Sequence, residues 1–375
     1  MKTRIALIFL PTFLTMFFIG TCHGETLNSF LINAMKAYRV PVVGYAIIDD
    51  GRIIDAQTVS IDPHIKTSPD SLFQAASISK SITAYAILSL VNHKNIDLNA
   101  SANKYLKGWK IDNKYNKNNP ILIRNLLDMT SGVSVSGFAG YPQGHPLPNL
   151  LQILNGAPPS NNLPIKVQHA PGTRYQYSGG AFQVLQKIIT DVTNKSFASY
   201  IEQKLFTPLR MENSTYHPAA NNTHIIPGFS GWDLKMLPGG WYNYACLGAG
   251  GVWSTPTDLA KFALNISDSL HGKDNGILKK TLAEQMLTRQ KNTDYGLGVV
   301  VGGKGKDLYF WKSGHNYGYH SQLIMFPNKG KGAVIMTNSE TGDEIINYMM
   351  PIIALKYSWP YYFPFFDELV EMPKH

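Results

Sequence analysis

The sequence predicts an α+β fold: an antiparallel sheet flanked by helices, with a large helical insertion. Two observations lead to this prediction. Strand patterns gather near the two ends of the chain, in about 40–96 and 290–358, whereas about 97–289 alternates helical patterns with long polar loops. Tight turns separate consecutive strand patterns, which is typical of antiparallel pairing. The sheet is therefore expected to form from both ends of the chain.

The chain enters the sheet through a helix and a hairpin. Apolar residues recur at helical spacing in 25–38, which predicts a short amphipathic helix. Two apolar runs follow at 42–48 and 52–56, and Asp49-Asp50-Gly51 is expected to join them as a hairpin turn. The stretch 73–91 then runs into a pattern that is apolar nearly all round, which predicts a buried helix.

The insertion carries three helical patterns separated by turn residues: 121–132, 181–189 and 254–264. Gly132 is expected to close the first of them at its C-cap. Residues 138–165 hold many Gly, Pro and Asn and few charges. Both a binding loop or lid and a plain connector fit that composition.

The remaining strands and a closing helix come from the last part of the chain. Apolar and aromatic runs predict strands at 295–301, 307–311, 319–326 and 332–338, and a helix at 343–357. No internal repeat is found. Both sheet parts and the insertion are assigned to one domain, 25–358.

Composition favours a folded, exported protein. Of the 375 residues, 44% are hydrophobic and 16% are charged, enough for a sizeable core in one large domain or two intimate ones. The first residues are positively charged, 5–19 form an apolar core, and small residues precede Gly24 as at a cleavage site. This pattern predicts a signal peptide, 1–24, cleaved after Gly24. An uncleaved membrane anchor and a lipid-modified Cys22 are the alternatives. The protein is therefore expected to be periplasmic or secreted.

Net charge and cysteine content argue against nucleic-acid binding and against a disulfide-stabilised fold. The net charge is +9, and without Lys2 and Arg4 it is 32 − 25 = +7, which suits anionic surroundings such as cell-envelope polymers or lipid headgroups. No basic run is interleaved with aromatics, so nucleic acid is not an expected partner. Cleavage leaves Cys246 alone, which rules out an intrachain disulfide, and a buried small residue is expected there.

Ser77 and Lys80 are the candidate nucleophile and its activator. Residues three apart share a helix face, with Cβ atoms roughly 5–6 Å apart. A serine hydroxyl needs a base within hydrogen-bond reach, and burial or a positive field lets a lysine serve as that base. The alternative is an N-cap serine beside a solvated lysine. Ser101 and Lys104 form a second copy of the same spacing.

Tyr177 is the second candidate. It lies in a turn just before the helical pattern 181–189, where a neighbouring cation would let its phenol take or give a proton. A packed aromatic with a satisfied hydroxyl is the alternative.

The third candidate stretch is Lys312-Ser313-Gly314-His315, expected where one strand ends and the next begins. Lys312 could hold an anionic substrate group. The small Ser313 and Gly314 would let a ligand lie along the strand edge. Backbone N–H groups near His315 and at Ser77 could form an oxyanion hole. The alternative is a hairpin turn with a solvated lysine.

Together the three stretches resemble the serine β-lactamase and penicillin-binding-protein superfamily. Order and spacing are similar to its Ser-x-x-Lys, Tyr-x-Asn and Lys-Thr-Gly motifs, as found in class C β-lactamases, DD-peptidases and the esterases and D-aminopeptidases related to them. Supporting stretches are 123–127, 130–132, 171–173 and 250–255. The resemblance covers about 30–355 and implies a β-lactamase/transpeptidase-like fold.

The resemblance also implies a role for each motif residue. Ser77 would be the acylated nucleophile, and Lys80 and Tyr177 the pair that takes its proton and later activates water. Lys312 would hold this network and a substrate carboxylate, while Ser77 and His315 would supply the oxyanion N–H groups. Which of Lys80 and Tyr177 is the base stays open.

One position departs from the family pattern. Gly179 stands where the family has asparagine, and Ser313 replaces threonine. The resemblance implies that the asparagine holds the amide side chain of the substrate, so its loss puts penicillin-type turnover in doubt. Its absence is also expected to leave more room, which suits an ester or an unusual peptide.

These observations predict an exported serine hydrolase that forms an acyl-enzyme with a β-lactam, a D-amino-acid peptide or a carboxylic ester. The alternative is a non-catalytic or slowly acylating sensor of β-lactams or muropeptides on the same fold. No metal or organic cofactor is expected, because the 11 histidines show no metal-binding spacing and His320 fits a strand-face position. The aromatic tail, 359–375, either packs on the domain or contacts a membrane surface.

Overall fold

The computed structural model describes residues 27–360, apart from residues 114, 116–118, 220, 274–275 and 291–292. The predicted signal peptide, 1–24, lies outside the described residues, as does the tail beyond Pro360. Within the described residues, no helix is long and apolar enough to cross a membrane.

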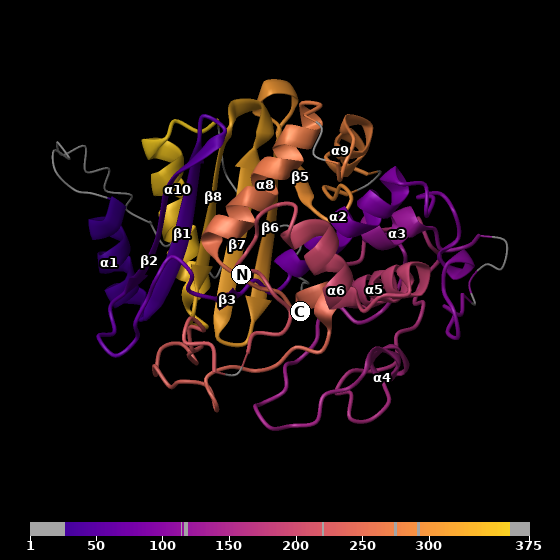
Figure 1. Cartoon of the computed structure of the whole chain (residues 1–375), viewed down its shortest axis with the longest axis horizontal. Helices are drawn as coiled ribbons and strands as arrows, with labels where there is room; N and C mark the ends of the chain where they lie inside the picture. The colour runs from indigo at the N-terminus through magenta and orange to yellow at the C-terminus, as the bar shows by residue number, and fades with distance from the viewer. Residues whose placement is uncertain are drawn as a thin grey trace, which may run out of the picture.

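Strands from both ends of the chain meet in one antiparallel sheet, which confirms the predicted fold class (Figure 1). The strand order is β2-β1-β8-β7-β6-β5, so the N-terminal hairpin joins the C-terminal strands where β1 pairs with β8. The strands are β1 (Val42–Asp49), β2 (Arg52–Ser60), β5 (Val300–Gly302), β6 (Tyr309–Asn316), β7 (Tyr319–Phe326) and β8 (Lys331–Thr337). A separate two-stranded ribbon pairs β3 (Phe73–Gln74) with β4 (Trp253–Ser254).

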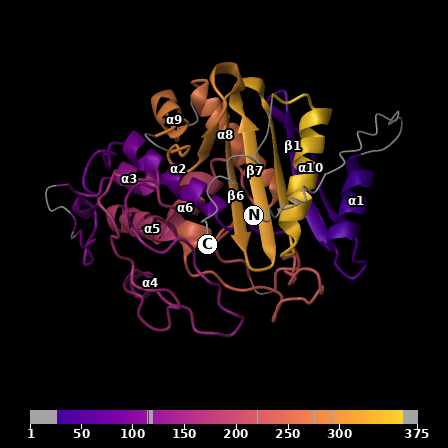
Figure 2. The ribbon, with the colours of Figure 1, turned by 180° about the vertical axis from the view of Figure 1, so that it is seen from behind.

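Helices cover both faces of the sheet. On one face lie α1 (Leu27–Tyr38) and α10 (Gly342–Lys356), and α10 is seen in front of the strands in Figure 2. On the other face lie α2 (Ile78–Asn92) and α8 (Pro256–Leu270), and α8 crosses in front of the sheet in Figure 1. Each face therefore buries its own apolar cluster, as a two-sided sheet must.

The insertion forms a helical lobe beside the β5 edge of the sheet (Figure 1). Its helices are α3 (Ile123–Leu127), α4 (Leu150–Asn155), α5 (Gly179–Thr193), α6 (Phe197–Ile201) and α7 (Leu247–Gly250), and α9 (Lys280–Met286) follows α8. Shorter helical turns are Ala102–Lys104, Glu202–Phe206, Gly305–Asp307 and Pro327–Lys329.

Helix α2 lies between the sheet and the helical lobe. Every residue of this helix from Ile78 to Leu90 is buried, as its all-round apolar sequence predicts. It contacts β6 and β7 on one side and α5 and α7 on the other. Ala76, which joins β3 to α2, adopts a φ of 47°, a left-handed conformation that turns the chain sharply before Ser77. The fold thus holds Ser77 at the junction of the two lobes.

The predicted C-cap at Gly132 is wrong. Helix α3 ends at Leu127, and Asp128 follows it as the C-cap. The Asp128 carboxylate accepts hydrogen bonds from the backbone N–H and the hydroxyl of Thr130, at 3.0 and 2.6 Å. This side-chain turn and the φ of 63° at Met129 stop the helix early.

Two strand boundaries were also wrong. The strand predicted at 295–301 is reduced to β5, Val300–Gly302, because Gly298 adopts a φ of 85° and packs closely on Ala84 of α2. The Lys312 stretch does not lie between strands but inside β6, which runs on to Asn316. The turn is formed by the next two residues, Tyr317 and Gly318.

Candidate active site

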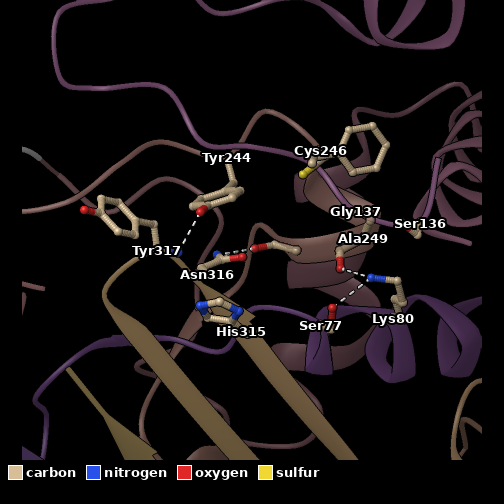
Figure 3. Close-up of a pocket in the computed structure, with 12 residues that line it drawn as sticks. Ser77, Lys80, Ser136, Gly137, Tyr244, Cys246, Ala249, His315, Asn316 and Tyr317 are labelled. Carbon is tan, nitrogen blue, oxygen red and sulfur yellow. Dashed lines mark hydrogen bonds between the residues drawn. The ribbon is translucent and has the colours of Figure 1, made fainter. Parts of the chain in front are cut away.

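Ser77 and Lys80 lie one turn apart at the start of α2 (Figure 3). The Lys80 ammonium donates hydrogen bonds to Ser77 Oγ at 2.9 Å and to the Ala249 carbonyl at 2.7 Å. Lys80 is only 2% exposed, so this lysine is not the solvated side chain of the alternative interpretation. Ala249 belongs to α7, so the helical lobe helps to aim the lysine at the serine.

The second Ser-x-x-Lys copy has a different geometry. Ser101 precedes the short turn Ala102–Lys104, and the Lys104 ammonium lies 5.6 Å from the centre of the Tyr105 ring. The Lys104 backbone N–H donates to the Ser101 carbonyl at 3.0 Å, but no hydrogen bond between the two side chains is found in the described residues. This pair provides a natural control for the first.

Tyr177 lies beside both lysines. It directly precedes Ser178, the N-cap of α5, whose hydroxyl accepts the Ala181 N–H at 2.9 Å and so orients the turn. The ammonium groups of Lys80 and Lys312 lie 5.1 and 5.3 Å from the centre of the Tyr177 ring. Three motifs that are far apart in the sequence therefore meet at one phenol.

The surroundings of Tyr177 change its acidity. Burial alone would raise the pKa of the phenol, but the charges of Lys312 and Lys80 and hydrogen bonds with Ser77 and Lys80 lower this pKa to about 7. By contrast, burial raises the pKa of the neighbouring Tyr244 phenol, which accepts the Tyr317 N–H at 2.8 Å. Tyr177 is thus the phenol suited to proton transfer near neutral pH.

One face of β6 is turned toward α2. Lys312, Gly314 and Asn316 alternate along this face, and the Asn316 amide donates to Gln74 at 2.8 Å and to the Gly250 carbonyl at 3.0 Å. A Cβ added at Gly314 would lie only 2.9 Å from the Ser77 backbone nitrogen. Glycine is therefore required at this position for the strand to approach the start of α2.

The backbone of β6 next to Ser77 has a free donor. The two-residue turn makes Asn316 and Tyr319 a hydrogen-bonded pair, so the next pair, His315 and His320, is not hydrogen-bonded. The His315 N–H therefore points away from β7, and β5 pairs only with Tyr309–Trp311. The Ser77 N–H also has no acceptor among the described residues. Two unpaired donors thus flank the serine hydroxyl.

The side chains of Ser313 and His315 belong to the other face of β6, by the alternation of the strand. The Ser313 carbonyl accepts a hydrogen bond from the Lys312 ammonium at 2.9 Å. The His315 imidazole lies 3.2 Å from the Glu340 carboxylate. Ser313 and His315 therefore face Ser77 with their backbone atoms, not with their side chains.

A cavity of about 470 Å³ opens over Ser77 and Lys80 (Figure 3). Its other lining residues are Ser136, Gly137, Phe138, Tyr244, Cys246, Ala249, Gly250, His315, Asn316 and Tyr317. Of the Gly- and Pro-rich loop 138–165, only its first residue lines this cavity. Burial raises the pKa of the Cys246 thiol to about 12, although Lys80 acts to lower it, so this cysteine is the inert small residue that was predicted.

The expectation of extra room at Gly179 is wrong. A Cβ at Gly179 would lie 2.9 Å from the Ser136 carbonyl and 3.0 Å from the Phe138 ring. The Gly179 N–H donates to that same carbonyl at 3.0 Å. The segment around Ser136 therefore fills the space where the family's asparagine would begin. Nothing local to the sequence of 134–138 indicates its contact with α5, so this segment was not among the predicted site residues.

The comparisons with known proteins identify the family. The Beta-lactamase family model matches residues 27–354. D-alanyl-D-alanine-carboxypeptidase/endopeptidase AmpH of Escherichia coli is 25% identical over 299 residues, covering 74% of this chain and 73% of AmpH. Protein flp of Staphylococcus aureus is 25% identical over 199 residues, 51% of this chain and 38% of that protein, so the match spans less than half of the relative.

Solved structures share the fold. A penicillin-binding protein homologue from Pyrococcus abyssi superposes with a TM-score of 0.72 at 22% identity, covering 89% of this chain and 77% of that one. A β-lactamase/D-alanine carboxypeptidase from Yersinia pestis gives a TM-score of 0.63 at 22% identity over 88% of this chain and 100% of that one. With the family model matching most of its length, the chain belongs to the Beta-lactamase family of the serine hydrolase superfamily.

Proposed function

We propose that this chain is an exported serine hydrolase in which Ser77 forms an acyl-enzyme with an ester or amide substrate. The observation that carries the proposal is the cluster of Ser77, Lys80, Tyr177 and Lys312, in which a nucleophile, a phenol of lowered pKa and two cations meet. Such a cluster has the parts that acyl transfer needs: a nucleophile, a base and a means to hold anionic charge.

The proposed base is Tyr177. Lys80 donates hydrogen bonds to Ser77 and Ala249, which places its amino group to hold the serine and to stabilise a phenolate. The Tyr177 phenolate takes the Ser77 proton while Oγ attacks the substrate carbonyl, and the carbonyl oxygen becomes an oxyanion held by the N–H groups of Ser77 and His315. The leaving group departs with the proton from Tyr177. In deacylation, Tyr177 takes a proton from water while the water attacks the acyl carbonyl. Ser77 then leaves with the proton from Tyr177, and the free acid is released.

The substrate class stays as broad as the site: a β-lactam, a D-amino-acid peptide of the peptidoglycan type, or a carboxylic ester. Lys312 favours a substrate that carries an anionic group near the reacting carbonyl. The filled space at Gly179 disfavours a substrate that depends on an asparagine contact there. The same feature supports the second candidate, a slowly acylating sensor that binds β-lactams or muropeptides, because a contact that would hold the amide side chain of the substrate for acylation is missing.

Steady-state hydrolysis of a p-nitrophenyl ester and of a reactive penicillin tests the proposal. Ser77→Ala should abolish release, whereas Ser101→Ala, which removes the serine of the second Ser-x-x-Lys copy, should leave it unchanged. A stable adduct without turnover in the wild type would favour the sensor. Release that continues in Ser77→Ala would remove Ser77 as the nucleophile.

Export forms part of the proposal and has its own test. The charged and apolar start of the chain supports cleavage after Gly24. The mass of the protein recovered from a bacterial periplasm or culture medium should correspond to a chain beginning at Glu25. A full-length mass in a membrane fraction would instead support the uncleaved anchor.

Membrane contact through the aromatic tail is proposed as well. The tail begins at Trp359, which is 9% exposed and packs on Phe326 with ring centres 5.4 Å apart. Its start therefore supports packing, while the aromatic run 361–366 stays a candidate for contact. If truncation after Pro360 leaves binding to lipid vesicles unchanged, the membrane role is refuted.

A further inference from the structure

Two histidines and a glutamate meet on the face of the sheet that α10 covers. His315 comes from β6, His320 from β7, and Glu340 follows β8. One ligand atom from each of the three side chains lies within 4.8 Å of those of the other two. The three side chains lie across β6 from the Lys312 side chain and take no part in the acylation proposed above, in which only the backbone N–H of His315 is used.

The fold holds the two imidazoles side by side. His315 and His320 face each other as a non-hydrogen-bonded pair, the cross-strand arrangement that brings side chains closest. Their rings stack with centroids 4.3 Å apart and an interplanar angle of 13°. Their ligand nitrogen atoms lie close enough for one ion to bind both once the rings reorient.

Glu340 completes the cluster from a third direction. Its carboxylate lies 3.2 Å from the His315 imidazole and accepts the Gly318 N–H from the β6–β7 turn. Its own backbone N–H donates to the Phe229 carbonyl at 3.1 Å. The carboxylate is thus oriented by the surrounding backbone, as supporting contacts orient the ligands of a metal ion.

His320 has a ligand atom that the rest of the chain does not use. Its Nε2 is buried and has no hydrogen-bond partner among the described residues. A hydrogen bond with the Glu340 backbone helps to fix the ring. A buried ring nitrogen without a hydrogen-bond partner is uncommon in folded proteins and marks a place where a ligand could bind.

We propose that His315, His320 and Glu340 bind one divalent first-row transition ion, of which Zn²⁺ is the representative. Two imidazoles and one carboxylate are a common protein ligand set for such ions and leave a fourth position for water. Asp343, at the start of α10 and close enough to act electrostatically on both histidines, adds negative charge. The ion binds neutral imidazoles, so a His315 ring protonated on both nitrogens releases its Nε2 proton to solvent, whereas a neutral ring keeps its one proton on Nδ1.

The position of the ion suggests a structural role. It would tie together the ends of β6, β7 and β8, next to the Tyr317-Gly318 turn, and the backbone of His315 borders the active-site cavity. An ion that binds only the folded chain raises its stability by mass action. Zinc should therefore raise the melting temperature of the protein.

Equilibrium dialysis of the untagged protein against Zn²⁺, followed by elemental analysis, tests the proposal. The wild type should retain one ion per chain. His315→Asn, which alters an exposed side chain, and Glu340→Gln should each weaken binding by at least about tenfold, since loss of even a supporting residue of a metal site costs 10–100-fold. His64→Asn, which changes an exposed histidine far along the sequence from the cluster, is the matched control and should bind as the wild type does.

Two further readouts separate a built site from loose surface binding. Co²⁺ should give a visible absorption band of four-coordinate intensity with the wild type and not with His320→Asn. Zinc should raise the melting temperature of the wild type and of His64→Asn, but not that of the variants at His315, His320 or Glu340. Circular dichroism verifies that each variant is folded. The proposal fails if the wild type retains no zinc, or if His315→Asn and Glu340→Gln both retain as much as the wild type.

Discussion

At the scale of single residues, the account rests on the ionisation of Tyr177. Burial opposes ionisation, but two ammonium groups and the hydrogen bonds of Ser77 and Lys80 outweigh it and lower the pKa of the phenol to about 7. Tyrosine in water has a pKa near 10. The phenolate is therefore present at neutral pH in this site and nearly absent in a free tyrosine.

Acylation by Ser77 should accordingly increase as the pH rises through about 7, because the phenolate form of the base appears in that range. Tyr177→Phe should lower the acylation rate by about 10²–10⁴, the usual contribution of a general base, and should remove this inflection. Single-turnover rates between pH 5 and pH 9, in buffers of constant ionic strength, provide the measurement. An unchanged inflection in Tyr177→Phe would assign the base elsewhere.

Lys312 should set the position of that inflection. Lys312→Met removes one of the two cations beside the phenol, so the pKa of Tyr177 should rise and the pH–rate profile should move to higher pH. Lys104→Met changes a lysine of the second motif copy and should leave the profile in place. A profile that does not move in Lys312→Met would mean that Lys312 does not act on the phenol.

At the scale of elements, the contact between α5 and the segment 134–138 distinguishes this site from the family pattern. The helix begins with Gly179 and Gly180, whose N–H groups donate to the Ser136 and Val135 carbonyls at 3.0 and 2.9 Å. A side chain at either glycine would collide with this segment. The glycine at 179 is therefore a packing requirement rather than an empty space.

Gly179→Ala should lower the free energy of unfolding by about 1–3 kcal/mol, the usual cost of overpacking, because its Cβ meets the Ser136 carbonyl. Gly137→Ala provides the matched control from the same segment, since a Cβ there has no atom within 4 Å. Its effect should stay within about 0.5 kcal/mol. Urea denaturation of both variants measures the difference, and equal stability of the two would contradict the close contact.

At the same scale, the sequence predicted most elements and misplaced those at the site. Polar Lys312, Ser313 and His315 do not resemble a strand, yet tertiary pairing extends β6 through them. The contacts of the Ser136 segment with α5 and of Glu340 with His315 were not predicted, because their partners lie far away in the chain. Short motifs predicted the reactive residues, whereas contacts between distant segments required the fold.

At the scale of the whole molecule, α2 joins the sheet and the helical lobe through one apolar cluster. Neither lobe can lose α2 and keep its core. The chain should therefore unfold in a single cooperative transition, since both lobes share this buried helix.

Ile82→Ala tests this coupling. Ile82 is fully buried in α2, so its truncation should lower the free energy of unfolding by about 2–5 kcal/mol. The single unfolding transition of the whole chain should shift to lower temperature. Leu355→Ala, at a residue that is 83% exposed, should change stability by no more than about 0.5 kcal/mol. Calorimetry that resolves two transitions, with only one affected by Ile82→Ala, would show that the lobes unfold independently.

The central claim is that Ser77 carries the acyl group. The most direct test is to mix the protein with a reactive penicillin and, separately, with a p-nitrophenyl ester, to stop each reaction within seconds by acid, and to map the adduct by peptide mass spectrometry. The account predicts an acyl group on the peptide that contains Ser77, absent in Ser77→Ala and retained in Ser101→Ala. An acyl group on another residue would contradict the claim. Continued hydrolysis by Ser77→Ala would contradict it as well.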